Sequence, residues 1–293
     1  MSTPTRITHL VNGVPWEGTA ERTSPVFNPA TGVQTGELDL ASAELVGEVV
    51  GVAKAAWESS WQRSSLTQRT QVLFKFRELL NAKKADIGAL ITAEHGKVLS
   101  DAEGEVTRGL EVAEFACGIP HLLKGGFSEN VSTKVDVYSI RQPLGVVAII
   151  SPFNFPAMVP LWFVPIAIAC GNAVVIKPSE KDPSAVNAVA ELWAEAGLPD
   201  GVLNVVHGDK EAVDALLEHP DVKAISFVGS TPIAEYVYDV GTRNGKRVQA
   251  LGGAKNHMLV LPDADLDLAA DAAVNAGFGS AGARCMAISA LVA

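Results

Sequence analysis

Cys285 lies in a stretch, residues 275–286, that is rich in glycine, alanine and serine. Small neighbours let other chain segments approach the sulfur closely and let backbone N–H groups face a ligand. A thiolate is a strong nucleophile, but a free cysteine is mostly protonated near neutral pH, so catalysis requires a base, a positive charge or backbone dipoles nearby. Arg284 supplies one fixed positive charge. On this stretch alone, the plainer interpretation of a small core residue is favoured.

Asn154 is a second candidate for chemistry, because its side-chain amide can donate to an oxyanion. It lies between Phe153 and Phe155 and directly follows the end of an apolar run. The alternative interpretation is a turn residue two positions before Pro156. Spacing alone does not decide between the two.

Dinucleotide binding is indicated by residues that follow two other apolar runs. Lys177 and Glu180 are placed to grip the two hydroxyls of an adenosine ribose, and Glu180 would repel a 2′-phosphate, which favours NAD over NADP. Gly229 and Ser230 precede a predicted helix, whose N-terminus attracts a pyrophosphate. Ser230 is also explained by ordinary N-capping, and no Gly-x-Gly-x-x-Gly motif opens any of the helices predicted after Gly145.

The elements that must position these residues alternate along the chain from Gly145. Short apolar runs predict strands at 146–150, 173–176, 202–206 and 224–228, and helical patterns fall at 157–170, 183–196, 211–218 and 232–242. This alternation is typical of βαβ units and a doubly wound parallel sheet. Ligands of such sheets bind at the carboxyl ends of the strands, which is where the candidate residues lie.

The preceding part of the chain predicts strands and turns over residues 1–40, with a turn at 28–32, and helices at 41–60, from about Leu66, and at 100–117. Arg108 falls in the third helix, where the local interpretation is a solvated side chain paired with Glu105 or Glu111. Residues 131–142 alternate polar and apolar, which predicts a strand with one exposed face. We expect this segment to be an arm that packs on another subunit.

Composition excludes several classes of function. The 293 residues are 48% hydrophobic, carry a net charge of −10 and include three scattered cysteines. An acidic chain without a basic cluster argues against binding nucleic acid or an anionic membrane, and the cysteines do not indicate a disulfide framework. The longest apolar run, 157–169, contains prolines and is too short to span a bilayer. We expect a cytoplasmic protein with no membrane segment and no metal site.

Five motifs occur in an order that resembles the aldehyde dehydrogenase superfamily, and essentially the whole chain takes part. They are Pro-Phe-Asn-Phe-Pro at 152–156, Lys-Pro-Ser-Glu at 177–180, Phe-Val-Gly-Ser-Thr at 227–231, Leu-Gly-Gly-Ala-Lys at 251–255 and the cysteine stretch. More narrowly, residues 154–163, 251–257 and 284–289 resemble the CoA-acylating methylmalonate-semialdehyde dehydrogenase branch.

The resemblance implies a role for each candidate. Cys285 would be the nucleophile, and Asn154 with the Cys285 backbone N–H would form the oxyanion hole. Arg108 and Arg284 are the candidates for holding a substrate carboxylate, since planar guanidinium groups suit carboxylates. The implied NAD contacts are Ser151, Phe153, Lys177, Glu180, Lys181, Gly229, Ser230 and Gly252.

Ala250 departs from the hydrolytic members of the superfamily, which carry a glutamate base immediately before Leu-Gly-Gly. Without that base water is a poor second nucleophile, and a thiol is the better acceptor of the acyl group. The acylating branch shares this loss. The resemblance therefore implies oxidation of methylmalonate or malonate semialdehyde to propionyl-CoA or acetyl-CoA, with loss of the carboxylate. Such substrates are intermediates of valine, pyrimidine (thymine) or inositol breakdown.

The domain organisation follows from the same resemblance. We expect a discontinuous NAD-binding domain (1–128 and 145–251), a β-hairpin arm for oligomerisation (129–144) and the start of a catalytic domain (252–293) that is truncated after Cys285. Met286, Ile288 and Leu291 are then expected to face water, and the longer form is expected to be a homodimer or homotetramer. The alternatives to the acylating enzyme are a hydrolytic aldehyde dehydrogenase and a non-catalytic NAD-binding fragment.

Overall fold

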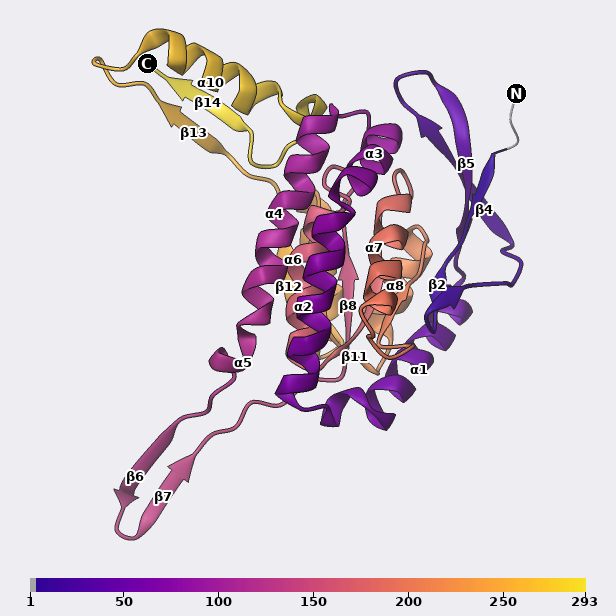
Figure 1. Cartoon of the computed structure of the whole chain (residues 1–293), viewed down its shortest axis with the longest axis vertical. Coiled ribbons are helices and arrows are strands. Elements are labelled where there is room, and N and C mark those ends of the chain that lie inside the picture. The colour runs from indigo at the N-terminus through magenta and orange to yellow at the C-terminus, as the bar shows by residue number, and fades with distance from the viewer. Residues whose placement is uncertain (1–3) are drawn as a thin grey trace.

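The computed structural model describes residues 4–293 and is centred on a seven-stranded sheet in the order β12-β11-β8-β9-β10-β2-β3 (Figure 1). Strands β8 to β12 are parallel, whereas β2 and β3 extend the sheet as an antiparallel edge. The strands are β2 (Leu10–Val11), β3 (Val14–Pro15), β8 (Val146–Ile150), β9 (Ala173–Lys177), β10 (Leu203–Val205), β11 (Val222–Val228) and β12 (Arg247–Leu251).

The strand order makes the sheet doubly wound, as the sequence predicts. From β8 the chain moves outward through β9 and β10, then returns to the other side of β8 for β11 and β12. The order therefore reverses between β8 and β11, and the crevice outside the carboxyl ends of these two strands is where such sheets bind ligands.

Helices cover both faces of the sheet. They are α1 (Ala43–Ser59), α2 (Leu66–Ala82), α3 (Lys84–His95), α4 (Leu99–Cys117), α5 (Ile119–Leu122), α6 (Met158–Ala169), α7 (Ser184–Glu195), α8 (Lys210–Glu218) and α9 (Thr231–Arg243), with a 3-10 turn η1 (Trp61–Arg63). Helices α1, α8 and α9 pack on Val146, Ala148 and Ile150, whereas α2, α3, α4, α6 and α7 pack on the face that carries Val147 and Ile149. Successive strand residues point to opposite faces, so a continuous apolar strand serves both cores.

Helix α3 and strand β12, among the elements of this domain, are absent from the sequence prediction. Helix α3 has only three buried residues, Ile87, Gly88 and Ile91, so its apolar periodicity is weak. It ends at Gly96, whose φ of 85° is the left-handed conformation common after a helix. Strand β12 alternates exposed and half-buried positions, so it lacks the apolar run that marks its neighbours.

Three smaller units surround the domain. The first forty residues form β1 (Thr5–Ile7), β4 (Arg22–Asn28) and β5 (Val33–Leu40), a separate sheet in the order β1-β5-β4 whose hairpin turns at 28–32 as predicted. After Leu251 come β13 (Asn256–Leu259), α10 (Leu266–Phe278), the 3-10 turn η2 (Ser280–Gly282) and β14 (Ile288–Val292). This last unit stands away from the sheet in Figure 1. Met286 and Leu291 in it are exposed as expected, whereas Ile288 is half-buried.

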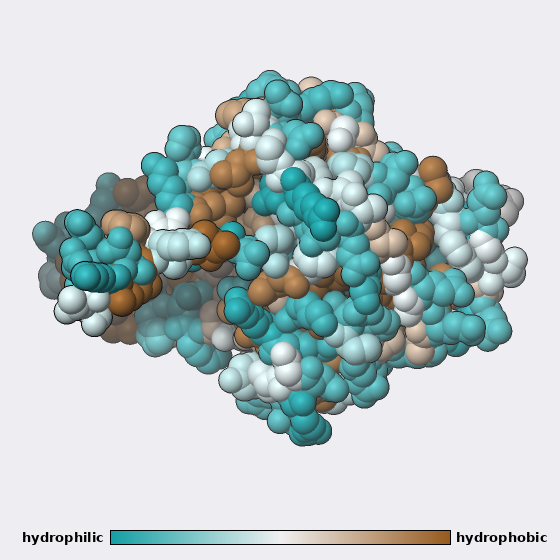
Figure 2. Space-filling view, turned by 90° about the horizontal axis from the view of Figure 1, so that it is seen from below, coloured by the Kyte–Doolittle hydropathy of each residue, from teal (hydrophilic) through white to brown (hydrophobic). Residues whose placement is uncertain are grey.

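The third unit is a hairpin of β6 (Phe127–Ser132) and β7 (Val135–Tyr138), which projects from the body in Figure 1. The alternation over 131–142 predicts one strand with one exposed face. The expected hairpin arm is present, but its turn falls within that predicted strand, at 133–134, where Lys134 has a φ of 62°, and every residue of both strands is exposed. Seen from the arm's end of the molecule, apolar patches interrupt the hydrophilic surface (Figure 2). Across residues 4–293 no helix combines the length and apolar character needed to cross a bilayer.

Candidate active site

Cys285 lies in the loop between η2 and β14 and packs against an apolar cluster at the carboxyl edge of the sheet. The cluster consists of Phe155, Met158 and Val159 at the start of α6 and Val228 at the end of β11. The sulfur therefore lies beside the crevice between β8 and β11, although it belongs to a different unit of the chain. Its backbone is fixed by the Asn256 side chain, whose Nδ2 donates to the carbonyls of Cys285 (3.1 Å) and Ala287 (3.0 Å).

The turn before Cys285 has an unusual backbone. Ser280, Ala281 and Gly282 have φ values of 55°, 55° and 72°, so two residues with side chains are left-handed in succession. Such residues persist only where surrounding contacts hold them. The buried N–H of Ser280 donates to Asp101 Oδ2 at 3.0 Å, which links this turn to the first turn of α4.

Asn154 lies in the loop between β8 and α6, next to the cluster that Cys285 contacts. Its carbonyl accepts a 2.7 Å hydrogen bond from Lys97 Nζ. Lys97 also forms a 2.7 Å ion pair with Glu105, and both side chains have no exposed surface. Sequence reasoning missed this pair. The signal was weak, because neither residue follows a strand and Glu105 was considered only as a partner for Arg108.

Ser230 occupies the N-cap position of α9, but its side chain makes no capping hydrogen bond. Ordinary capping therefore does not account for this serine, and its hydroxyl is available to a ligand at the helix N-terminus. The start of α9 is instead tied to the loop that follows β12, because the Gly253 N–H donates to Thr231 Oγ1 at 3.0 Å. A Cβ on Gly252 would lie 3.1 Å from Thr231 Cα, so this glycine permits the close approach.

Lys177 is the last residue of β9, and Glu180, three residues later, lies next to it. Lys177 Nζ is 3.5 Å from Glu180 Oε2 and donates to the Gly208 carbonyl at 2.8 Å. Burial lowers the pKa of the Lys177 ammonium, with Glu180 opposing that shift. Glu180 keeps 40% of its side chain exposed, so its carboxylate is accessible to a ligand in the crevice, whereas the Lys177 side chain is 7% exposed.

Gly229 and Ser151 complete the predicted set at this edge. The Gly229 N–H donates to the Leu251 carbonyl at 3.0 Å, and a Cβ there would collide with the Phe227 ring at 2.4 Å. Ser151 is buried, its N–H donates to the Lys177 carbonyl at 3.1 Å, and its hydroxyl has no partner within residues 4–293. The residues predicted for NAD therefore gather at the ends of β8, β9, β11 and β12.

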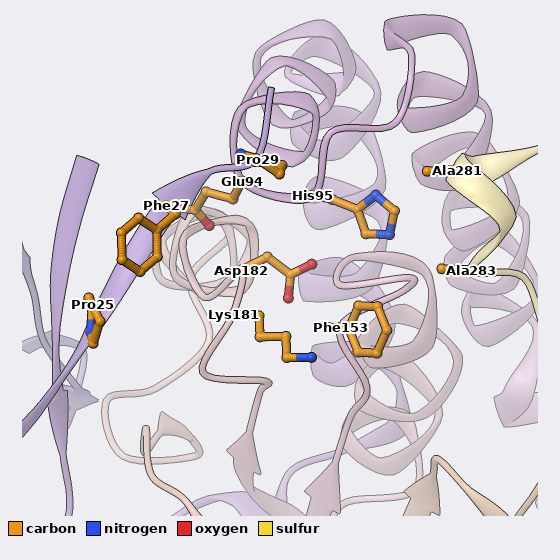
Figure 3. A pocket seen from close by; sticks show the side chains of 10 residues that line it. All are labelled: Pro25, Phe27, Pro29, Glu94, His95, Phe153, Lys181, Asp182, Ala281 and Ala283. Carbon is orange, nitrogen blue, oxygen red and sulfur yellow. The ribbon is translucent and has the colours of Figure 1, made fainter. Parts of the chain in front are cut away.

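Phe153 and Lys181 lie against each other at one wall of a cavity of about 480 Å³ (Figure 3). Lys181 Nζ is 4.4 Å from the centre of the Phe153 ring, and the His95 ring stacks on the same phenyl group at 6.1 Å. Other walls come from the tip of the β4–β5 hairpin and from the turn before Cys285. Neither Cys285 nor Asn154 lines this cavity, so it adjoins the candidate reaction centre without containing it.

The cavity also holds acidic and imidazole groups that sequence reasoning did not select. Both oxygens of Asp182 are buried without a partner in the described chain, and burial together with nearby Glu94 raises the pKa of this carboxyl well above its usual range. Burial likewise raises the pKa of Glu94, which bonds to Ser184. Burial, assisted by Lys97, lowers the pKa of His95 to about 4.

Arg108 does not pair with Glu105 or Glu111, so the local interpretation of this residue is wrong. Glu105 is occupied by Lys97, and Arg108 Nε instead lies 3.3 Å from Met158 Sδ, with the guanidinium 6.0 Å from the Phe155 ring. Arg284 has a buried Nε without a hydrogen-bond partner in the described chain. Within residues 4–293, neither arginine has a carboxylate at ion-pair distance.

His207 and Ala250 pack in or against the interior of the domain. His207, after β10, is fully buried and stacks on His9 at 5.7 Å, and burial lowers its pKa well below the usual range. Ala250 lies on β12 opposite Phe227, with its methyl group against the core beneath α8 and α9. No group of metal-binding side chains occurs in the part of the chain that the structure describes.

A doubly wound sheet with an available helix N-terminus at its reversal point is typical of a dinucleotide-binding domain, and the cysteine loop facing that point supplies a candidate nucleophile. A sequence profile of the aldehyde dehydrogenase family matches residues 16–293. The chain belongs to this family.

Close relatives carry more specific names. A malonate-semialdehyde dehydrogenase of Pseudomonas aeruginosa PAO1 is 56% identical over 97% of this chain and 57% of its own length. A solved structure described as a methylmalonate-semialdehyde dehydrogenase of Sinorhizobium meliloti 1021 with NAD has a TM-score of 0.96 and 53% identity, over 99% of this chain and 59% of its own. The structure of the methylmalonate-semialdehyde dehydrogenase of Oceanimonas doudoroffii has a TM-score of 0.95 and 55% identity, over 98% of this chain and 58% of its own. The chain thus spans somewhat under three fifths of these relatives.

Proposed function

We propose that this protein serves the NAD-dependent, CoA-acylating oxidation of malonate or methylmalonate semialdehyde. The observation that carries the proposal is the pair of arginines without carboxylate partners, because Arg108 contacts Phe155 and Met158, the same residues that Cys285 contacts. A substrate with a carboxylate at one end and an aldehyde at the other matches this arrangement of a cation and a nucleophile. The names of the close relatives support the same substrate class.

The chain's own residues provide the first step. Cys285, as the thiolate, attacks the aldehyde carbon and forms a thiohemiacetal. Asn154 and the Cys285 backbone N–H donate to the oxyanion, and such preorganised donors act most strongly where water is excluded. Arg108 and Arg284 hold the carboxylate, which keeps the aldehyde carbon near the sulfur.

The residues at the sheet edge fit NAD. Ser230 and the N-terminus of α9 meet the pyrophosphate, Lys177 and Glu180 meet the adenosine ribose, and Phe153 with Lys181 borders the path toward Cys285. When bound, NAD accepts the hydride from the thiohemiacetal carbon, which leaves a thioester on Cys285. The carboxylate of Glu180 disfavours the 2′-phosphate of NADP.

The acyl group then leaves to CoA. The CoA thiolate attacks the thioester carbon and expels the Cys285 thiolate, so one C–S bond replaces another and the enzyme is regenerated. Ala250 offers no base for water, which favours the thiol as acceptor. The substrate carboxylate departs as carbon dioxide or bicarbonate at or before this stage, and a proton from solvent takes its place on the carbon, giving acetyl-CoA or propionyl-CoA. We propose valine or thymine breakdown in the cytoplasm as the setting of the reaction, because both routes yield such semialdehydes.

The arm carries the proposal for assembly. Its exposed strands bear Phe127, Val131, Val137 and Tyr138, each more than 45% exposed. Pairing with a second copy of the protein would cover them, in a homodimer or homotetramer.

The experiment follows NADH absorbance with methylmalonate semialdehyde, with and without CoA, and identifies the acyl product by mass spectrometry. We expect NADH formation that requires CoA and is lost in Cys285→Ser. Free acid formed without CoA would identify a hydrolytic enzyme, and absence of NAD binding would contradict the proposal altogether. Ala250→Glu tests the acceptor separately, because a restored base should raise the CoA-independent rate.

A further inference from the structure

Helix α4 presents two carboxylates to opposite sides of the candidate reaction centre. Asp101 and Glu105 are four residues apart, so they lie one above the other on the same face of the helix. That face packs against α6 and lies close to the turn before Cys285 (Figure 1). The two residues therefore reach both loops that the proposed mechanism uses.

Glu105 binds the C-terminal end of the loop that carries Asn154. Its Oε1 accepts hydrogen bonds from the N–H groups of Ala157 (2.8 Å) and Met158 (3.0 Å), at the start of α6. Ala157 is the N-cap of that helix and provides no capping side chain, so Glu105 supplies the cap from a neighbouring helix.

Lys97 binds the same loop at Asn154 itself. Its ammonium donates to the Asn154 carbonyl and pairs with Glu105 Oε2, both at 2.7 Å, and lies 4.3 Å from the centre of the Phe155 ring. The backbone from Asn154 to Met158 is thus held between one cation and one anion, each without exposed surface. Charges this deeply buried require full hydrogen bonding, which fixes the geometry of the pair and of the loop.

Asp101 holds the other loop. Its carboxylate accepts from the Ser280 N–H at 3.0 Å, at the first of three left-handed residues. That conformation is unfavourable for residues with a Cβ, so the turn depends on contacts from outside. A charge-assisted bond to a rigid helix meets this need and sets where the chain enters the cysteine loop.

We propose that Asp101, Glu105 and Lys97 are positioning residues that hold Asn154 and Cys285 in register with each other through helix α4. This rests on the proposed roles of Cys285 and Asn154. A misplacement of about 1 Å in such a site costs on the order of a hundredfold in rate. The ion pair itself is weak support for stability, since buried pairs are often replaceable by apolar residues at little cost. Substituting these residues should therefore disturb the geometry of the site, and hence kcat, more than the stability of the fold.

The test compares Asp101→Ala, Asp101→Asn and the double substitution Lys97→Met with Glu105→Leu. Lys246→Met is the matched control, because this buried lysine donates to the carbonyls of His219 (2.5 Å) and Val222 (2.9 Å) in another part of the molecule. Asp101→Asn retains an acceptor for the Ser280 N–H and should rescue much of the effect of Asp101→Ala. Measurements are kcat and KM for NAD reduction with the best aldehyde, Kd for NAD, and Tm.

We expect kcat to fall about tenfold to a thousandfold in Asp101→Ala and in the double variant, with KM and the NAD Kd within about threefold. Lys246→Met should lower Tm without lowering kcat. Unchanged kcat in Asp101→Ala, or an equal loss in Lys246→Met at equal Tm, overturns the inference. A different aldehyde preference in the parent protein would contradict the proposed substrate and leave this comparison intact.

If the parent protein reduces no NAD with any aldehyde, two other readouts decide. Amide hydrogen exchange at Ala157 and Met158 should accelerate about tenfold or more in the double variant but not in Lys246→Met. The pH profile of Cys285 alkylation should shift in Asp101→Ala and return in Asp101→Asn. No change in either readout overturns the inference.

Discussion

Arg108 has a position that its local sequence does not indicate. On α4 it has acidic neighbours at helical spacing, yet one of them, Glu105, is committed to Lys97. The guanidinium consequently turns toward Met158 and Phe155, beside the cysteine. A cation held without a carboxylate partner beside a nucleophile is best explained by an anionic substrate group.

Replacing Arg108 or Arg284 by Leu should therefore raise KM for a semialdehyde acid. A hydrogen bond to a charged group contributes about 1.5–3 kcal/mol, so the expected rise is about tenfold to a hundredfold. Propanal, which has no carboxylate, should be affected less than about threefold. Arg243→Leu removes an exposed arginine paired only with Asp239 and is the control. Equal losses on both aldehydes would indicate a structural role.

Asp182 should make the protein less stable as the pH rises. Burial raises the pKa of this carboxyl above its unfolded value, so between the two values the folded state binds more protons than the unfolded state. Stability is then lost as the pH increases through that window. Asp182→Asn removes the titration and should raise Tm near neutral pH by about 2–4 °C, the shift that ~1 kcal/mol produces in a domain of this size.

The measurement is Tm against pH for the two proteins. The gain from Asp182→Asn should shrink toward about pH 4, where the unfolded carboxyl is itself protonated. His9 and His207, whose pKa values are lowered by burial, are common to both proteins and cancel in the difference. A gain that is constant with pH would show that ionisation of Asp182 is not its cause.

At the scale of elements, the arm and the parallel sheet differ in what holds them. Each residue of β8 and β9 is buried, whereas no residue of β6 or β7 is. An isolated two-stranded hairpin is marginally stable in water. The arm therefore depends on packing against another surface for its stability, whereas the buried core of the domain does not depend on the arm.

Under the proposal that the arm mediates assembly, replacing residues 127–138 by a short Gly-Ser linker should dissociate the proposed oligomer and leave the domain folded. The expected result is a monomer by light scattering, with Tm reduced only by the loss of assembly. Tyr238→Ser, which changes an exposed aromatic residue outside the arm, is the control. An unchanged oligomer would place the interface elsewhere, and an unfolded monomer would contradict the independence of the domain.

The same contrast explains how far the sequence predicts the fold and the site. Strands with continuous apolar runs, such as 146–150, and the polar residues at their ends are visible because both signals are local. The links from Lys97 to Asn154 and from Asp101 to Ser280 join residues 57 and 179 positions apart, and no local pattern encodes such contacts. Helix α3 and strand β12 escaped prediction because each buries only part of one face.

At the scale of the whole molecule, the chain divides into a well-buried domain and a sparsely packed unit around Cys285. Helix α10 contains no buried residue, and Leu266, Leu268 and Phe278 are each at least 68% exposed. Among the described residues, this unit is joined to the domain by contacts such as the Ser280–Asp101 hydrogen bond to α4 and the packing of Cys285 on Phe155 and Met158. The proposed nucleophile and the proposed dinucleotide crevice thus belong to regions that differ in burial.

Backbone amides of α10 should therefore exchange with solvent about a hundredfold faster than those of α6, corresponding to an opening free energy ~3 kcal/mol lower. Hydrogen exchange followed by mass spectrometry measures both helices in one sample. Helix α7, which is buried on one face like α6, is the internal reference. Equal protection of α10 and α6 would show that the two regions open together.

The short β3 strand also has a consequence for handling the protein. Pro15 closes this edge of the main sheet, and because proline has no N–H, another chain cannot readily continue the hydrogen-bond ladder there. If the first fifteen residues were trimmed for expression, β2 and β3 would be lost and β10 would become an unpaired edge strand of the sheet. Shortened versions of the protein should accordingly form soluble aggregates on storage, whereas a fusion partner placed ahead of Thr5 leaves the blunt edge in place.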